Sequence, residues 1–89
     1  MEEVVIVSTV RTPIGSYGGS LKDLSAYDLG TLVLAESAKR AKINPPQVDL
    51  VILAQSYQSG EYVNLARMCL LKAGWPIEIP GITIDCRCC

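Results

Sequence analysis

The stretch Val48-Asp49-Leu50-Val51-Ile52-Leu53-Ala54 decides the fold class, because an apolar run of this length is typical of a strand buried on both faces. A helix is predicted before it: Ser25 can cap its N-terminus, with Asp28 completing a variant capping box, and it continues to about Lys42. Asn44-Pro45-Pro46 ends that helix, and the β-branched run 4–7 before it predicts an earlier strand. Strand, helix and strand in this order predict a βαβ unit with parallel strands, and hence an α/β protein.

The second half of the chain again predicts a helix followed by a strand. Asn64 can cap a second helix from Leu65 to Ala73, which Gly74 and Pro76 end in the usual order. The last predicted strand is Ile82–Asp85, followed at once by a cluster of cysteines.

Composition narrows the possible functions. The 89 residues include 8 Lys+Arg and 9 Asp+Glu, for a net charge of −1, so a nucleic-acid partner is not expected. With 49% hydrophobic residues the chain can fold, but one domain of this size buries only roughly 60% of its surface, so we expect part of the apolar surface to meet a partner. No apolar stretch is long enough for export or for a membrane, which predicts a cytoplasmic protein with reduced thiols.

Three of the four cysteines lie together, at Cys86, Cys88 and Cys89. Buried packing, a thiolate metal site and a catalytic nucleophile are all open readings, although a zinc site usually draws on two separated pairs of ligands. A thiol at a strand end before a helix N-terminus would be activated by the helix dipole. Cys69 stands in an apolar run and is expected to be a packing residue.

Neither the glycine-rich loop at residues 15–19 nor Arg67 is predicted to be a functional site. The glycines of Gly15-Ser16-Tyr17-Gly18-Gly19 do not fit a nucleotide-binding spacing, so we expect a surface or subunit-contact loop. Arg67 is expected to be solvated or paired in a surface salt bridge.

The ordered motifs Arg11-Thr12-Pro13-Ile14-Gly15, Asn64-Leu65-Ala66-Arg67 and Pro80-Gly81-Ile82-Thr83-Ile84 resemble those of thiolases, the acetyl-CoA C-acetyltransferases. The resemblance extends over essentially all 89 residues. It implies a layered α/β/α fold, of which residues 1–89 are the N-terminal βαβ portion, with the remainder expected on another polypeptide.

The resemblance also implies a function. Counting from Thr83-Ile84-Asp85 places the family's nucleophile at Cys88, which would attack an acyl-CoA thioester to form an acyl-enzyme. Coenzyme A thioesters are then the substrates, with no further cofactor, no metal, and a homodimer or homotetramer of the completed unit expected.

Three positions depart from the family pattern: Asp85 replaces the usual Asn, Cys86 a basic or amide residue, and Cys89 a Gly, Ser or Ala. A close, unpaired Asp85 carboxylate would disfavour the thiolate of Cys88. The sequence contains no His, so the catalytic histidines of the family must come from elsewhere. An inactive thiolase-like subunit that binds acyl-CoA or a protein partner is therefore the alternative prediction.

Overall fold

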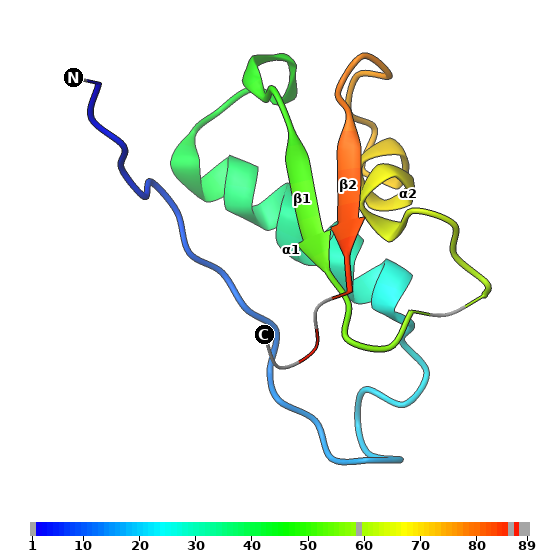
Figure 1. Cartoon of the computed structure of the whole chain (residues 1–89). Coiled ribbons are helices and arrows are strands. Elements are labelled where there is room, and N and C mark those ends of the chain that lie inside the picture. The colour runs from blue at the N-terminus through cyan, green and yellow to red at the C-terminus, as the bar shows by residue number, and fades with distance from the viewer. Residues whose placement is uncertain (1, 59, 86, 88–89) are drawn as a thin grey trace.

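The computed structural model describes residues 2–58, 60–85 and 87. Five elements follow in order, shown in Figure 1: α1 (Ala26–Ala41), the 3-10 turn η1 (Pro45–Gln47), β1 (Val51–Ala54), α2 (Leu65–Lys72) and β2 (Gly81–Ile84). Both predicted helices are confirmed to within one residue at either end. The two later strands are confirmed as strands, with β1 shorter than predicted and β2 shifted by one residue.

The capping box at the start of α1 is present. The Asp28 amide donates to Ser25 Oγ at 3.1 Å, and the Ser25 amide donates to Asp28 Oδ2 at 3.0 Å. Each bond satisfies a backbone group that the first helical turn leaves without a partner. At the other end Lys42 adopts a left-handed conformation with φ +57°, which closes the helix before the prolines.

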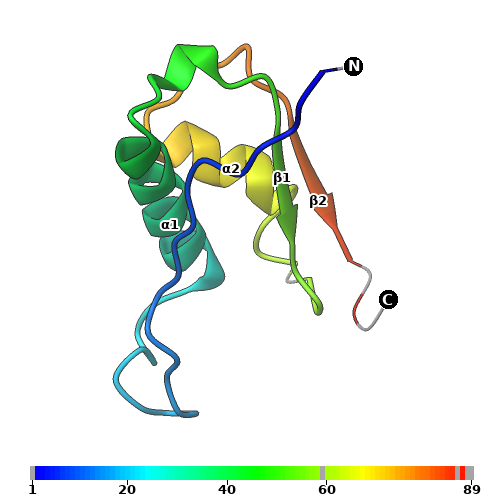
Figure 2. The same ribbon diagram turned by 90° about the vertical axis from the view of Figure 1, so that its left-hand side faces the viewer.

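The strands β1 and β2 pair in parallel, with Val51 opposite Gly81 and Ala54 opposite Ile84. Because α2 connects them, the βαβ unit of the described chain is β1-α2-β2. Both helices lie on the same side of the sheet, as the turned view in Figure 2 shows, and α2 contacts both strands and α1. The described chain therefore has one layer of helices on one layer of strands.

The core lies between α2 and the sheet. Ala66 and Leu70 of α2 are fully buried and meet Val51 of β1, with Trp75 and Ile79 from the connection to β2 closing the cluster. Burial of such side chains is the main stabilising contribution in a domain of this size.

The opposite face of the sheet is apolar and uncovered. Ile52, Ile82 and Ile84 alternate with inward-facing neighbours and are 57%, 48% and 43% exposed. Single exposed apolar residues are common, but a contiguous sheet face of isoleucines is typical of a surface that another layer covers.

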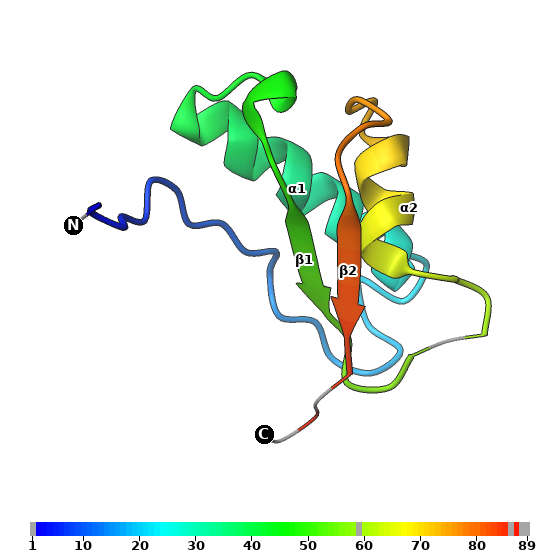
Figure 3. The same cartoon turned by 45° about the horizontal axis from the view of Figure 1, so that its top comes forward.

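The predicted strand at residues 4–7 is wrong for the described chain. Val4 and Ile6 are 95% and 85% exposed, and the segment has no regular structure. It runs beside the body of the fold (Figure 3), and a cavity of about 290 Å³ lies between Ile6 and Val7 on one side and α1 on the other. A strand needs a neighbour to pair its backbone groups, and in the described residues β1 pairs with β2 alone. The predicted βαβ unit therefore occurs one helix later than expected.

Candidate functional site

The predicted nucleophile follows the C-terminal end of β2. Cys88 lies outside the described residues, as do Cys86 and Cys89, and the described part of the site consists of the segments that lead to it. The backbone hydrogen bonds between β1 and β2 continue one residue past β1, where the Gln55 amide donates to the Ile84 carbonyl at 3.0 Å. The loop after β1 and the residues after β2 consequently leave the sheet at the same end (Figure 1), which is where parallel sheets carry their ligand sites.

The N-terminus of α2 is hydrogen-bonded to β2 through side chains. Asn64, with φ +51°, caps the helix by accepting from the Arg67 amide at 3.3 Å. Its Nδ2 donates to the Gly81 carbonyl at 2.8 Å. The Thr83 hydroxyl donates to Asn64 Oδ1 and accepts from the Ala66 amide, each at 2.9 Å. These bonds fix the helix end against the strand that continues toward Cys88.

Gly81 allows this close approach. A Cβ atom at this position would lie 2.7 Å from the backbone nitrogen of Arg67 and 2.9 Å from its Cα. Backbone atoms of a packed helix cannot give way as a flexible side chain can, so the first residue of β2 has to be glycine for the strand to lie against α2.

The prediction that Arg67 is solvated or in a salt bridge is wrong. Its Nη1 donates to the Ile79 carbonyl at 2.6 Å, and the side chain is half-buried. A carbonyl in the connection between α2 and β2 would otherwise lack a partner, so Arg67 ties that connection to the helix.

Arg87 lies immediately before the predicted nucleophile. Its backbone is left-handed, with φ +42°. Its Nε lies 3.9 Å from Asp85 Oδ1, and its Cζ lies 4.6 Å from the centre of the Tyr57 ring. Asp85 is thus paired, and the loop after β1 contacts the turn after β2.

A second polar contact joins α1 to α2. Lys72 Nζ lies 2.7 Å from Asp28 Oδ1 and 4.3 Å from the centre of the Tyr27 ring. The hydrogen bonds from Lys72 and Ser25 lower the pKa of the Asp28 carboxyl to about 2, and the contact with Asp28 raises the pKa of the Lys72 ammonium. The pair holds the two helices together.

Cys69 is a packing residue, as predicted. It is fully buried, its Sγ lies 3.6 Å from the Tyr27 carbonyl oxygen, and burial raises the pKa of its thiol. A thiol with a raised pKa carries little thiolate at neutral pH, so Cys69 is not a candidate nucleophile.

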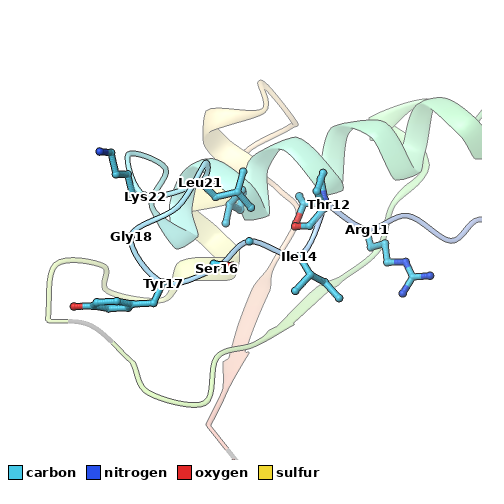
Figure 4. A pocket seen from close by; sticks show the side chains of 11 residues that line it. Arg11, Thr12, Ile14, Ser16, Tyr17, Gly18, Leu21 and Lys22 are labelled. Carbon is cyan, nitrogen blue, oxygen red and sulfur yellow. The ribbon is translucent and has the colours of Figure 1, made fainter.

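The glycine-rich loop forms an open hollow of about 760 Å³, shown in Figure 4. Arg11 and Lys22 stand at opposite ends of it (Figure 4), so their charges do not converge on one point. Between them Ile14, Tyr17 and Leu21 make the lining largely apolar. This arrangement does not resemble a phosphate-binding loop, in which backbone amides and a cation surround one anion.

Within residues 2–58, 60–85 and 87, no three acidic, histidine or cysteine side chains come together as a metal would require. The thiolate alternative at Cys86, Cys88 and Cys89 lies outside that part of the chain. None of the helices in the described part has the length and apolar character needed to cross a membrane.

The family assignment comes from the comparison with known proteins. The sequence model described as "Thiolase, N-terminal domain" matches residues 4–89. This chain belongs to the thiolase family. The crystal structure of the Bacillus anthracis acetyl-CoA acetyltransferase superposes with a TM-score of 0.87 and 42% identity over 91% of this thiolase chain and 21% of that chain. The expected fold, a portion of the layered thiolase fold, is confirmed by this likeness.

Two relatives show how much of a thiolase the chain represents. It is 44% identical over 86 residues to an acetyl-CoA acetyltransferase of Syntrophomonas wolfei, covering 97% of this chain and 22% of that protein. It is 43% identical over 88 residues to one of Clostridioides difficile, covering 99% of this chain and 82% of that protein. The thiolase chain therefore spans about a fifth of the length of the first relative and most of the second.

Two features of the site were missed from the sequence. Thr83 fits a β-branched strand, so nothing local marks its hydroxyl as a partner of Asn64, which is 19 positions away. Tyr57 stands in a polar loop whose path over Arg87 depends on where two strands end. An Asn cap preceding a parallel strand with a central Thr is the one signal that could have suggested the first contact.

Proposed function

We propose that this chain is the nucleophile-bearing part of an acetyl-CoA C-acetyltransferase, which forms or cleaves acetoacetyl-CoA and related 3-ketoacyl-CoA thioesters. The observation that carries the proposal is the 42–44% identity to three acetyl-CoA acetyltransferases over at least 91% of the chain. The placement of the cysteine segment after β2, at the end of a parallel sheet, supports it.

The proposed first step is acyl transfer to Cys88. Its thiolate attacks the thioester carbonyl carbon, a new carbon–sulfur bond forms, and the bond between that carbon and the sulfur of coenzyme A breaks. Coenzyme A leaves and takes up a proton. The sequence contains no His, so the histidines that the family resemblance implies for this proton transfer would lie outside these 89 residues.

The proposed second step resolves the acyl-enzyme. A base supplied by the remainder of the fold removes a proton from the carbon next to the carbonyl of a second acetyl-CoA. The resulting carbanion attacks the acyl carbon, so a carbon–carbon bond forms, the bond to the Cys88 sulfur breaks, and the thiolate is released. Thiolysis is the reverse sequence, with coenzyme A accepting the acyl group. No cofactor beyond these thioesters is part of the proposal.

The proposal includes a partner for the uncovered sheet face. The remainder of the thiolase fold, on another polypeptide or segment, would cover Ile52, Ile82 and Ile84 and contribute the acid–base residues. The completed unit is proposed to form a homodimer or homotetramer in the cytoplasm, where the thiol of Cys88 stays reduced.

Thiolysis of acetoacetyl-CoA tests the proposal, with the protein purified together with the polypeptides that accompany it. We expect Cys88→Ser to lower kcat on the order of a thousandfold or more, because it removes the nucleophile. Cys69→Ala is the matched control and should retain activity, since Cys69 is fully buried. Turnover that survives Cys88→Ser would contradict the proposal. Binding of coenzyme A without turnover by the unaltered protein would instead identify the inactive acyl-CoA-binding subunit.

A further inference from the structure

Lys72 differs from the other lysines of the chain in what its ammonium contacts. Lys22, Lys39 and Lys42 are exposed, and in the part of the chain that the structure describes no ion pair involves them. Lys72 Nζ instead donates to Asp28 Oδ1 at 2.7 Å, although 40% of its side chain is exposed. A reagent in solution can therefore approach Lys72, and the contacts of its ammonium decide whether it reacts.

Two groups from the first turn of α1 hold this ammonium. Lys72 Nζ lies 2.7 Å from the Asp28 carboxylate and 4.3 Å from the centre of the Tyr27 ring, within the range of a cation–π interaction. Asp28 is fixed by the Ser25 amide, which donates to its Oδ2 at 3.0 Å. The Tyr27 ring in turn lies against the ring of Tyr62, with 5.4 Å between their centres. Both groups are thus positioned by contacts of their own.

Acylation of a lysine requires its neutral amine. The ammonium first loses a proton to solvent, and the nitrogen then attacks the carbonyl carbon of a thioester. A carbon–nitrogen bond forms, the carbon–sulfur bond breaks, and coenzyme A leaves as a thiolate while the nitrogen gives up a second proton. The hydrogen bond to Asp28 raises the pKa of the Lys72 ammonium, and the Tyr27 ring attracts only the charged form. Both contacts therefore oppose the first step.

We propose that Asp28 and Tyr27 protect Lys72 from acylation by acyl-CoA thioesters. Acetylation would remove the Lys72 charge and with it the ion pair that joins α2 to α1, so the protection preserves this link. A protein that binds acetyl-CoA meets such thioesters continually. That setting rests on the proposed function, whereas the low reactivity of the Lys72 amine does not.

Acetylation rates at single lysines measure this protection. The protein, purified with the polypeptides that accompany it, is treated at pH 8 and low salt with N-hydroxysuccinimidyl acetate, which has no coenzyme A group, and in parallel with acetyl-CoA. Peptide mapping gives the initial rate at each lysine. We expect Asp28→Asn to raise the Lys72 rate about threefold with either acetyl donor, because the ion pair is lost. Tyr27→Leu should raise it about twofold.

Two controls separate the contact from other effects. The amide oxygen of Asp28→Asn can still accept from the Ser25 amide, so the start of α1 is retained, and the rates at Lys22, Lys39 and Lys42 should stay unchanged. Glu36→Gln removes the same charge from α1, but Glu36 pairs with Arg40 at 3.0 Å, so the Lys72 rate should equal that of the parent.

An equal Lys72 rate in the parent and in Asp28→Asn, with either acetyl donor, would overturn the proposal. A rise in Glu36→Gln as large as that in Asp28→Asn would do the same, because the overall charge of the chain would then explain both. Neither measurement uses thiolase turnover, so a protein that fails to cleave acetoacetyl-CoA still confirms or contradicts the protection of Lys72.

Discussion

The hydroxyl of Thr83 in β2 donates a hydrogen bond to Asn64 Oδ1 at the start of α2, with 2.9 Å between the two oxygens. The same hydroxyl accepts from the Ala66 amide, so one side chain joins a strand to the N-terminus of a helix. This contact therefore fixes β2, the strand that precedes Cys88 in the chain, against the N-terminus of α2.

Thr83→Val should destabilise the fold by about 1–3 kcal/mol, because the valine leaves the Ala66 amide without its acceptor and removes one of the two donors to Asn64 Oδ1, the other being the Arg67 amide. Thr83→Ser retains the hydroxyl and is expected to recover most of the loss. Urea unfolding of the three proteins measures the difference. Equal stability of the Val variant and the parent would show that these bonds contribute nothing net.

Gly81→Ala should destabilise by about 1–3 kcal/mol, since its Cβ would lie 2.7 Å from the Arg67 nitrogen and force β2 away from α2. Gly60→Ala is the matched control: its Cβ would meet no atom within 4 Å, and the change in stability should stay within about 0.5 kcal/mol. Thermal or urea unfolding distinguishes them, and similar values for both variants would be inconsistent with close packing at Gly81.

The contact between Asp28 and Lys72 predicts a loss of stability in acid. The pKa of Asp28 is lowered in the folded chain from 3.8 to about 2, so the folded state binds its proton less readily than the unfolded state. The contribution of Asp28 is therefore fully present above about pH 5 and disappears as the pH falls toward 2.

Asp28→Asn should accordingly flatten the dependence of the unfolding free energy on pH between 5 and 2. Lys72→Met should weaken that pH dependence, because it removes the hydrogen bond from Lys72 Nζ to Asp28 Oδ1. Urea unfolding at a series of pH values is the measurement. A parent protein and Asp28→Asn variant with parallel pH profiles would rule out the linkage.

Local signals allowed part of the fold to be predicted. Ser25 with Asp28 marks the start of α1, and Asn64 with Gly74 marks both ends of α2, because capping and termination depend on residues close in sequence. Strand pairing depends on distant partners instead. A β-branched run such as 4–7 can indicate a strand, but it stays irregular where no neighbouring strand pairs with it.

In the candidate site, too, local features could be predicted from the sequence, whereas contacts between distant residues could not. Cys88 follows from the resemblance to thiolases and stays a prediction, because it lies outside the described residues. The contact between Arg87 and the Tyr57 ring could not be predicted, since it joins residues 30 positions apart through the loops after two different strands. The buried position of Cys69 could be predicted from its apolar neighbours alone.

Peptide mapping after incubation with acetyl-CoA tests the central claim most directly. The protein, purified with its accompanying polypeptides, is quenched in acid and digested, and each of the four cysteine positions is examined for an added acetyl group. Our account predicts acetylation of Cys88, and its loss in Cys88→Ser. Acetylation of Cys86 or Cys89 in place of Cys88, or an unmodified set of cysteines in a preparation that turns over acetoacetyl-CoA, would contradict it.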